Sequence, residues 1–342
     1  MKFGAFDHID AGVGGLQAQY EGRLQLAEIY EKLGYHAYHV AEHHGTPLGV
    51  APSPSLILAA ISQRTKRLRF GPLVYLLPLY HPVRLLEEIC MLDQLSGGRF
   101  ELGVGRGAAF VEAKRFDKKS EDIQPLFDET LDILIKGLQA GESFSYEGKY
   151  YSIKDLPMTV HPLQQPHPPL WYGTSTPDKT VWGAANKVNM LSLSTPQVTR
   201  GVTDRYREEW KKLGHAEADI PFLGIARNVF VADTDEEAKR IGARAWSAFA
   251  KHLSWLWDRD GIPFPVPMWT PDFEKASAAG AVIAGSPETV RQAIAKLKDE
   301  AGINYMATEL VFGDMTLEEA KRCATLFGQH IVPAFAKEPV TA

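Results

Sequence analysis

Three consecutive residues, Glu42-His43-His44, form the segment best equipped for proton chemistry. They directly follow a short apolar run at 37–41. An imidazole titrates near pH 6.5, so a histidine can act as a general acid or base close to neutral pH. Two other interpretations stay open for this segment: loop histidines without a chemical task, and a metal site.

The metal interpretation comes from His39, Glu42 and His43, which have the H-x-x-E-H spacing of inverted zinc peptidases. That motif requires a helix, but the segment is short and follows Gly34, which favours a strand. On a strand, positions four apart are separated by more than ~13 Å, at about 3.4 Å per residue. Two nitrogens at that separation do not readily share one zinc ion. We therefore expect no metal.

A glycine-rich turn at 103–108 surrounds a single cation, Arg106. Its glycines at 103, 105 and 107 loosely match the dinucleotide-binding pattern G-x-G-x-x-G/A. That pattern belongs to a first strand–helix unit, however, and it does not explain Arg106. A second interpretation is that small residues admit a ligand while Arg106 offers two N–H donors to a phosphate. An ordinary surface turn is the third.

Three hydroxyl groups, from Thr174, Ser175 and Thr176, precede Pro177 at the start of another helical pattern. Free N–H groups and the dipole at a helix N-terminus favour an anion. An ordinary helix cap is the alternative. If Arg106 and this cluster follow neighbouring parallel strands, they lie close together, and a phosphate becomes the better interpretation.

Eight short strand-like runs, most followed by a helical pattern, must position these residues. They cover 3–6, 37–41, 68–77, 99–104, 170–172, 190–193, 222–231 and 305–312. Alternating strands and helices predict a parallel sheet, and eight repeats in about 330 residues favour a closed (β/α)₈ (TIM) barrel over an open sheet. We expect one α/β barrel domain over residues 1–342, with its active site at the C-terminal ends of the strands.

Two segments depart from this alternation. Aromatic residues on either side of Glu147-Gly148 predict a small inserted hairpin near 143–153. The stretch 254–285 is rich in Trp, Pro and Gly, and we expect a long irregular excursion that forms a lid over the barrel mouth. Burial of its three tryptophans in a dimer interface is the alternative.

Composition limits the class of protein. The 342 residues are 45% hydrophobic and 23% charged, which excludes disordered, collagen-like and coiled-coil proteins. The net charge of −5 is too small for a surface that binds nucleic acid or membrane. No apolar run reaches the roughly 18 residues of a spanning helix, and the N-terminal residues predict no signal peptide. Cys90 and Cys323 form no disulfide framework, so we expect a cytoplasmic protein.

Ordered motifs over nearly the whole chain resemble the flavin-dependent bacterial luciferase-like monooxygenases. The most specific is Leu92-Asp93-Gln94-Leu95-Ser96-Gly97-Gly98-Arg99-Phe100. The others are Met1-Lys2-Phe3-Gly4, Ala41-Glu42-His43-His44, His81-Pro82-Val83-Arg84, the turn at 103–107, Gly285-Ser286-Pro287-Glu288 and the final Leu326-Phe327 and Val332-Pro333.

The resemblance implies a (β/α)₈ barrel that uses reduced FMN and O₂, through a C4a-(hydro)peroxyflavin, to oxygenate a small apolar organic substrate. It implies that His43 is catalytic, with Glu42 beside it at the flavin, and that Arg106 holds the FMN phosphate. It also implies a non-proline cis peptide at 73–74 beneath the flavin ring. The remaining cofactor-binding residues that it implies are Leu73, Val74, Thr174, Ser175 and Thr176.

The family resemblance also implies partners, namely a separate NAD(P)H:flavin reductase and a second copy in a homodimer. Two departures, Gly105 in place of a cysteine and Ala109 in place of a tyrosine, argue against light emission with a long-chain aldehyde. Two alternative functions remain open. One is a deazaflavin-dependent dehydrogenase that transfers hydride, and the other is a flavin-binding protein without catalysis.

Overall fold

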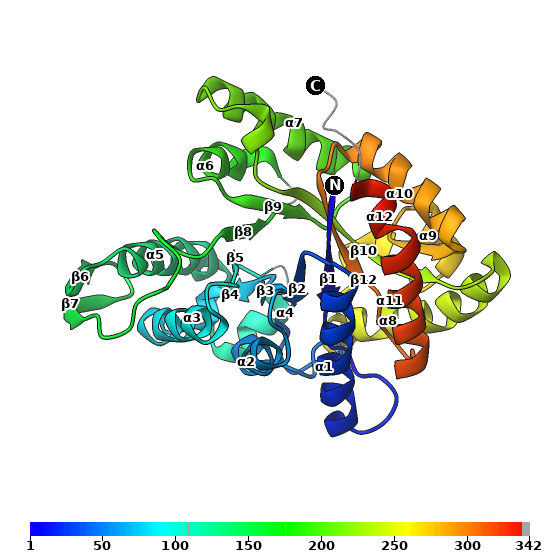
Figure 1. The fold of residues 1–342 in the computed structure, drawn as a ribbon. Helices are drawn as coiled ribbons and strands as arrows, with labels where there is room; N and C mark the ends of the chain where they lie inside the picture. Colours follow the sequence, from blue (N-terminus) through cyan, green and yellow to red (C-terminus); the bar gives the residue numbers. More distant parts are fainter. Residues whose placement is uncertain (108–109, 175, 337–342) are drawn as a thin grey trace.

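The structure, a computed structural model, describes residues 1–107, 110–174 and 176–336. Parallel strands form a ring at its centre, and helices surround them (Figure 1). The order around the ring is β3-β2-β1-β12-β10-β9-β8-β5-β4. The strands are β1 (Lys2–Asp7), β2 (Ala37–Val40), β3 (Arg69–Pro72), β4 (Tyr75–Leu76), β5 (Leu102–Gly105), β8 (Leu170–Gly173), β9 (Asn189–Ser192), β10 (Leu223–Val231) and β12 (Tyr305–Glu309).

The ring closes between β3 and β5. Strands β3 and β4 are two halves of the third barrel strand, because only Leu73 and Val74 separate them. The Phe70 N–H donates to Arg99 O at 3.2 Å, and the Glu101 N–H donates to Phe70 O at 2.8 Å. The predicted (β/α)₈ barrel is therefore confirmed, and each of the eight predicted runs contributes one of its strands.

Helices and short 3₁₀ turns connect the strands. Local sequence signals explain several of their ends: Ser286 accepts a hydrogen bond from the Thr289 N–H, with Pro287 following it. Gly34, at φ 79°, follows the first helix. The helices are α1 (Leu16–Lys32), α2 (Pro54–Arg64), α3 (Pro82–Ser96), α4 (Phe110–Ala113), α5 (Ser120–Leu138), α6 (Thr180–Ala185), α7 (Pro196–Lys212), α8 (Asp235–Arg259), α9 (Phe273–Ala278), α10 (Pro287–Ala301), α11 (Leu317–His330) and α12 (Val332–Ala336). The 3₁₀ turns are η1 (Leu77–Leu79), η2 (Lys114–Phe116), η3 (Pro177–Lys179), η4 (Glu217–Asp219) and η5 (Pro267–Trp269).

The predicted hairpin is present as β6 (Ser143–Glu147) and β7 (Ser152–Pro157), which pair antiparallel beside α5 (Figure 1). Both cysteines are free and buried. None of the described helices combines the length and the hydropathy needed to cross a membrane.

The prediction of an irregular segment at 254–285 is wrong for most of its length. Helix α8 continues to Arg259, because its apolar spacing extends through Leu256 and the first proline comes only at Pro263. The segment then forms η5, α9 and an additional strand, β11 (Val282–Gly285), which pairs parallel with the C-terminal half of β10. Trp269 is buried against Trp246 of α8, at 5.8 Å between ring centroids.

Two kinds of side chain fill the barrel interior. Trp171, Phe222 and Tyr305 lie near the N-terminal ends of their strands and contact one another. Farther along the strands the interior is lined by small side chains, including those of Ala226 and Ala307, which are register partners on β10 and β12. The aromatic layer therefore closes the N-terminal end, while small side chains line the barrel toward the C-terminal end, where parallel barrels bind their ligands.

A polar cluster is sealed into the closed N-terminal end, which we call the barrel floor. The Glu101 carboxylate accepts hydrogen bonds from Arg69 Nε and, at 2.6 Å, from Trp171 Nε1, and His36 lies 3.5 Å away. Burial by itself raises the pKa of Glu101, but the neighbouring imidazoles and Arg69 outweigh it and hold this pKa at about 2. The carboxylate is thus an ionised anchor for several strands.

His39 belongs to the same floor. Its Nε2 lies 2.7 Å from the Tyr305 hydroxyl, and burial lowers the pKa of His39 to about 4. Gly4 leaves room for this contact, since a Cβ there would lie 1.9 Å from the Tyr305 oxygen. His39 is therefore neutral and held away from His43, and the two histidines of the zinc-like spacing do not converge.

Candidate active site

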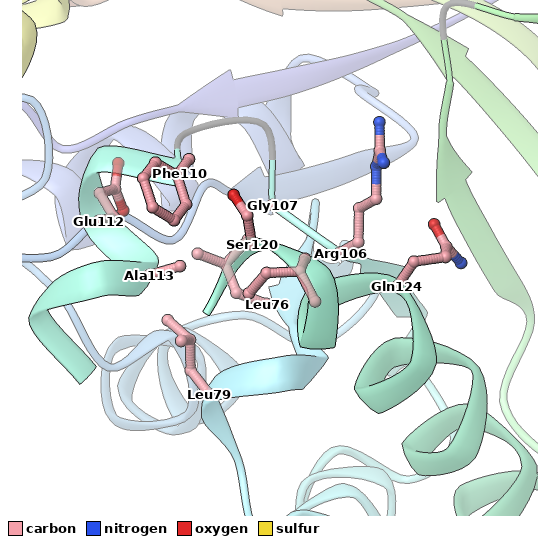
Figure 2. A pocket seen from close by; sticks show the side chains of 10 residues that line it. Leu76, Leu79, Arg106, Gly107, Phe110, Glu112, Ala113, Ser120 and Gln124 are labelled. Carbon is pink, nitrogen blue, oxygen red and sulfur yellow. The ribbon is translucent and has the colours of Figure 1, made fainter. Parts of the chain in front are cut away.

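The candidate site lies at the C-terminal ends of the strands, which we call the barrel mouth. Glu42-His43-His44 follows β2 and Arg106 follows β5. Glu112 comes from α4, on the connection that leaves β5. A pocket of about 190 Å³ lies at one side of this mouth. Figure 2 shows Phe110 and Glu112 of α4 on one side of it and Arg106 and Gln124 on the other, with Leu76 between them.

His43 is held by a buried carboxylate. Its Nδ1 lies 2.7 Å from Glu112 Oε1, and Glu112 Oε2 accepts the backbone N–H of His44 at 3.1 Å. Burial by itself lowers the pKa of His43, but the charge and hydrogen bond of Glu112 outweigh it and raise this pKa above its ordinary value. The imidazole is thus fixed in orientation and biased toward its protonated form.

Glu42 organises the loop around this imidazole. One carboxylate oxygen lies 2.7 Å from His44 Nε2. The other accepts the Leu76 N–H at 3.0 Å and the Tyr80 hydroxyl at 2.9 Å. Both oxygens are therefore occupied by the protein, so any contact of Glu42 with a cofactor stays a prediction.

The peptide bond between Leu73 and Val74 is cis, at the position that the family resemblance implies. Val74 packs against the apolar barrel interior and covers β5. A Cβ at Gly105 would lie 2.4 Å from Val74 Cγ2, and a Cβ at Gly103 would lie 2.0 Å from Pro72 O. These glycines therefore serve the close packing of β5 against the third strand, and the dinucleotide-binding interpretation of the turn is wrong.

Arg106 is an exposed cation at the edge of the mouth. Within the described residues it forms no ion pair and no hydrogen bond. It lies close enough to Tyr172 for its charge to oppose the burial that raises the pKa of that phenol. Figure 2 shows its side chain extending beside Gln124. An unpaired guanidinium at this edge is free to bind an anion such as a phosphate.

The hydroxyl residues lie at the end of the neighbouring strand. Val104 of β5 is the register partner of Tyr172 of β8, so Arg106 and Thr174 each follow two residues later. The Thr174 hydroxyl accepts the Thr176 N–H at 3.2 Å and donates to Thr176 O at 2.9 Å, which shapes a tight turn. Ser175 lies outside the described residues, as do Ala108 and Ala109. Arginine and hydroxyl donors on adjacent strand ends fit a phosphate group.

The second half of α8 covers part of the mouth. His252 Nδ1 lies 2.9 Å from Asp10 Oδ2, next to the end of β1. Asp260, just past the helix, forms ion pairs with Lys114, at 2.5 Å, and with Arg115, at 3.0 Å, both from η2. We expected an irregular lid to cover the mouth. In this part a helix covers it instead, and contacts to the loops after β1 and β5 hold that helix in place.

Sequence reasoning missed three polar residues of the mouth: His8, Glu112 and Glu309. His8 directly follows β1 and Glu309 ends β12, so inspecting the residues after the first and last strands would have found them. Glu112 had no comparable signal. It lies on α4, 69 residues from His43 in the chain, and only the fold brings the two together.

Known proteins were compared with this chain over its full length. The sequence profile described as luciferase-like monooxygenase matches residues 1–305. An uncharacterized protein, y4wF, of Sinorhizobium fredii is 38% identical over 93% of this chain and 92% of its own. The oxygenase component of the flavin-dependent trigonelline monooxygenase of Acinetobacter baylyi is 25% identical over 99% of this chain and 97% of its own.

Solved structures agree with these sequence matches. The monooxygenase RslO1 from Streptomyces bottropensis superposes with a TM-score of 0.87 at 26% identity, over 98% of this chain and 100% of its own. The oxygenating constituent of 3,6-diketocamphane monooxygenase from Pseudomonas putida, in complex with FMN, superposes with a TM-score of 0.80 at 22% identity, over 97% and 98%. With a closed barrel, a cis peptide at 73–74 and a profile match across most of its length, this chain belongs to the luciferase-like monooxygenase family.

Proposed function

We propose that the protein is an FMN-dependent monooxygenase that oxygenates a small organic substrate in the barrel mouth. The observation that carries this proposal is the His43–Glu112 pair, an imidazole held by a buried carboxylate that raises its pKa, at the mouth of the barrel. A protonated imidazole in a partly enclosed site is suited to general acid catalysis. The family match and the names of the relatives support the reaction class.

The residues present fit FMN. Arg106 would bind its phosphate, with Thr174 and Ser175 on the neighbouring loop and Thr176 beside them. Leu73 and Val74 would form the apolar surface under its ring, and Glu42 would support the loop that carries His43. When bound, reduced FMN supplies the electrons that activate O₂.

The protein's own groups would then control protons and water. His43 would take up or release its proton at Nε2, because Nδ1 is engaged with Glu112, which favours the protonated ring. Helix α8 and its contacts to Asp10 and η2 would limit the entry of water to the mouth. Neither role requires a metal ion.

A reductase partner follows from this proposal, because FMN must arrive in its reduced form. The relative named as an oxygenase component supports a two-component arrangement.

A homodimer is also part of the proposal, since Leu56 of α2 and Met91 and Leu95 of α3 are more than half exposed on adjacent helices. Sedimentation of the wild type and a Leu56→Glu variant would test it, and a monomeric wild type would contradict it.

Oxygen chemistry separates the proposal from its alternatives. The protein is mixed with reduced FMN without oxygen and then with ¹⁸O₂ and a panel of ketones, aldehydes and alkenes. We expect ¹⁸O in an organic product, and loss of that product in His43→Ala with FMN binding retained. Reduction of a deazaflavin by an alcohol without O₂ uptake would instead identify the hydride-transferring dehydrogenase. Tight flavin binding with no ¹⁸O product from any substrate would favour a non-catalytic flavin carrier.

A further inference from the structure

The contacts described so far hold the ring of His43 at one point only. Its Nδ1 lies 2.7 Å from Glu112 Oε1, and its Nε2 has no hydrogen-bond partner among residues 1–107, 110–174 and 176–336. A single hydrogen bond to a carboxylate tolerates a range of ring orientations, and the last torsion angle of a histidine side chain has broad energy wells. A second contact is therefore needed to set the plane of this ring, and with it the direction in which Nε2 points.

The second contact comes from His8, which directly follows β1. The two imidazole rings are stacked, with their centroids 5.3 Å apart and their planes 22° from parallel. In the part of the chain that the structure describes, no other aromatic ring packs against His43. The face of His8 is thus the surface against which His43 lies.

His8 is itself held on several sides. Its Nδ1 lies 2.7 Å from Glu309 Oε1, and Asn228 Nδ2 donates to Glu309 Oε2 at 2.9 Å. Phe6 and Phe249 of α8 make edge contacts with the His8 ring, at 4.9 and 5.4 Å between centroids. Because Asn228 and Glu309 are register partners on β10 and β12, the barrel itself fixes the orientation of His8.

The next residue in the loop, His44, has a ring that is held independently of His8. Its Nε2 lies 2.7 Å from Glu42 Oε1, and its ring lies edge-on to Phe116 at 4.8 Å between centroids. A change that loosens the whole loop would therefore release both His43 and His44. Loss of the stacked contact alone would release only His43.

We propose that His8 is a positioning residue, whose stacked ring fixes the plane of the His43 imidazole so that Nε2 points in one direction. The contact requires a flat ring at position 8 and does not depend on the charge of that ring. The proposal rests on the proposed function for its kinetic consequence, because a general acid or base that points the wrong way transfers its proton poorly.

Ring mobility in the flavin-free protein tests the proposal. Labelling histidine with ¹³C and ¹⁵N gives an order parameter for each ring, on a scale where rigid groups give about 0.85 and flexible ones less than about 0.6. We expect rigid rings for His8, His43 and His44 in the wild type. In His8→Leu, which keeps bulk but not a flat ring, the His43 value should fall below about 0.6 while His44 stays rigid. His8→Phe restores a flat ring and should keep His43 rigid.

The kinetic consequence is measured as ¹⁸O product formation. His8→Leu should lower kcat about 10- to 100-fold with KM within about twofold, because a misplacement of about 1 Å can cost 10²-fold. His8→Phe should recover most of that loss. His215→Leu is the control, since it removes a histidine ring from Trp210 beyond the end of α7, and it should change neither kcat nor the His43 order parameter.

Four results would overturn the proposal. They are a flexible His43 ring in the wild type, a rigid His43 ring in folded His8→Leu, equal loosening of His43 and His44, and as much loosening in His8→Phe as in His8→Leu. The first of these needs no variant, so it decides the question even if His8→Leu does not fold. A loosened ring with an unchanged kcat would overturn the kinetic role.

The ring measurements need no flavin, oxygen or substrate. A wild type that gives no oxygenated product would therefore contradict the proposed function and leave the result on the His43 ring intact. The two proposals fail separately.

Discussion

The two ends of the barrel use the same residue types for different purposes. At the floor, both oxygens of Glu101 are engaged by Arg69 and Trp171, and aromatic rings cover the cluster. At the mouth, Glu112 and Glu309 also use both oxygens, but each holds its histidine through Nδ1 alone. The other nitrogen faces the opening. A histidine–glutamate contact thus stabilises the fold where it is covered, and can do chemistry where one edge of the ring stays free.

The same contrast between floor and mouth is seen in His39 and His43, which lie within five residues of each other in the chain. Burial in the floor lowers the pKa of His39 to about 4, whereas Glu112 raises the pKa of His43 in the mouth. At neutral pH His39 is therefore neutral, whereas His43 is shifted toward its cationic form. The pKa of a histidine therefore follows from the end of the strand at which it lies and from its nearest carboxylate.

The largest expected effect is on activity. Replacing His43 by alanine should lower oxygenation about 10²–10⁴-fold, the contribution of a general acid or base, while flavin binding and the urea midpoint remain near those of the wild type. Product formation and urea unfolding measured on the same preparation check this. Normal turnover would return His43 to the role of a loop histidine.

Replacing Glu101 at the floor should lower the stability of the fold without changing the chemistry of the mouth. Glu101→Ala leaves Arg69 and the Trp171 N–H without their acceptor, and should lower the free energy of unfolding by about 3–5 kcal/mol, as for other broken buried pairs. Urea titration followed by tryptophan fluorescence measures it. If the folded variant at low temperature lost oxygenation as well, the division between floor and mouth would be wrong.

Lowering the pH should destabilise the protein through the same floor carboxylate, that of Glu101. Its pKa is held at about 2 in the folded protein, against about 4.5 for the free side chain. Because the folded pKa is the lower one, Glu101 stabilises the protein by about 3 kcal/mol above pH 4.5, and this contribution is lost as the pH falls toward 2. Urea midpoints at pH 7 and pH 3 should differ less in Glu101→Gln than in the wild type.

A smaller effect is expected at the edge of the mouth. Arg106→Ala should weaken FMN binding by about 1.5–3 kcal/mol, the scale of a charge-assisted hydrogen bond. Riboflavin, which has no phosphate, should be affected much less. Fluorescence titrations with both ligands test this, and equal weakening of the two would remove Arg106 from the phosphate site.

The smallest effect is expected where α8 meets η2. Asp260→Asn removes the ion pairs with Lys114 and Arg115, and exposed pairs of this kind contribute little. Hydrogen exchange should therefore rise by only about two- to fivefold over 252–260, with no change at the floor. Unchanged exchange would show that packing alone holds this helix over the mouth.

Much of this arrangement could be predicted from the sequence. The eight strands, the hairpin and the position of Arg106 follow from local patterns, because strand periodicity and turn residues act over a few neighbours. The pairing of His43 with Glu112, and of His8 with Glu309, could not be predicted this way. Each pair joins segments far apart in the chain, and only the closed ring brings them together. The extent of α8 differs from the prediction because Trp255 and Trp257 lie next to a Pro-rich stretch that indicates a loop, although the helical spacing continues through Leu256.

Gly105 and Val74 lie on adjacent strands, and the side chain of Val74 occupies the space that a side chain at position 105 would need. A side chain added at position 105 would meet Val74 Cγ2 at 2.4 Å, so bulk gained on β5 has to be removed from the third strand. The cysteine that luciferases carry at the corresponding place therefore cannot simply be transferred to this chain. Positions 74 and 105 therefore set the width of this side of the barrel together, and engineering of the mouth has to change both.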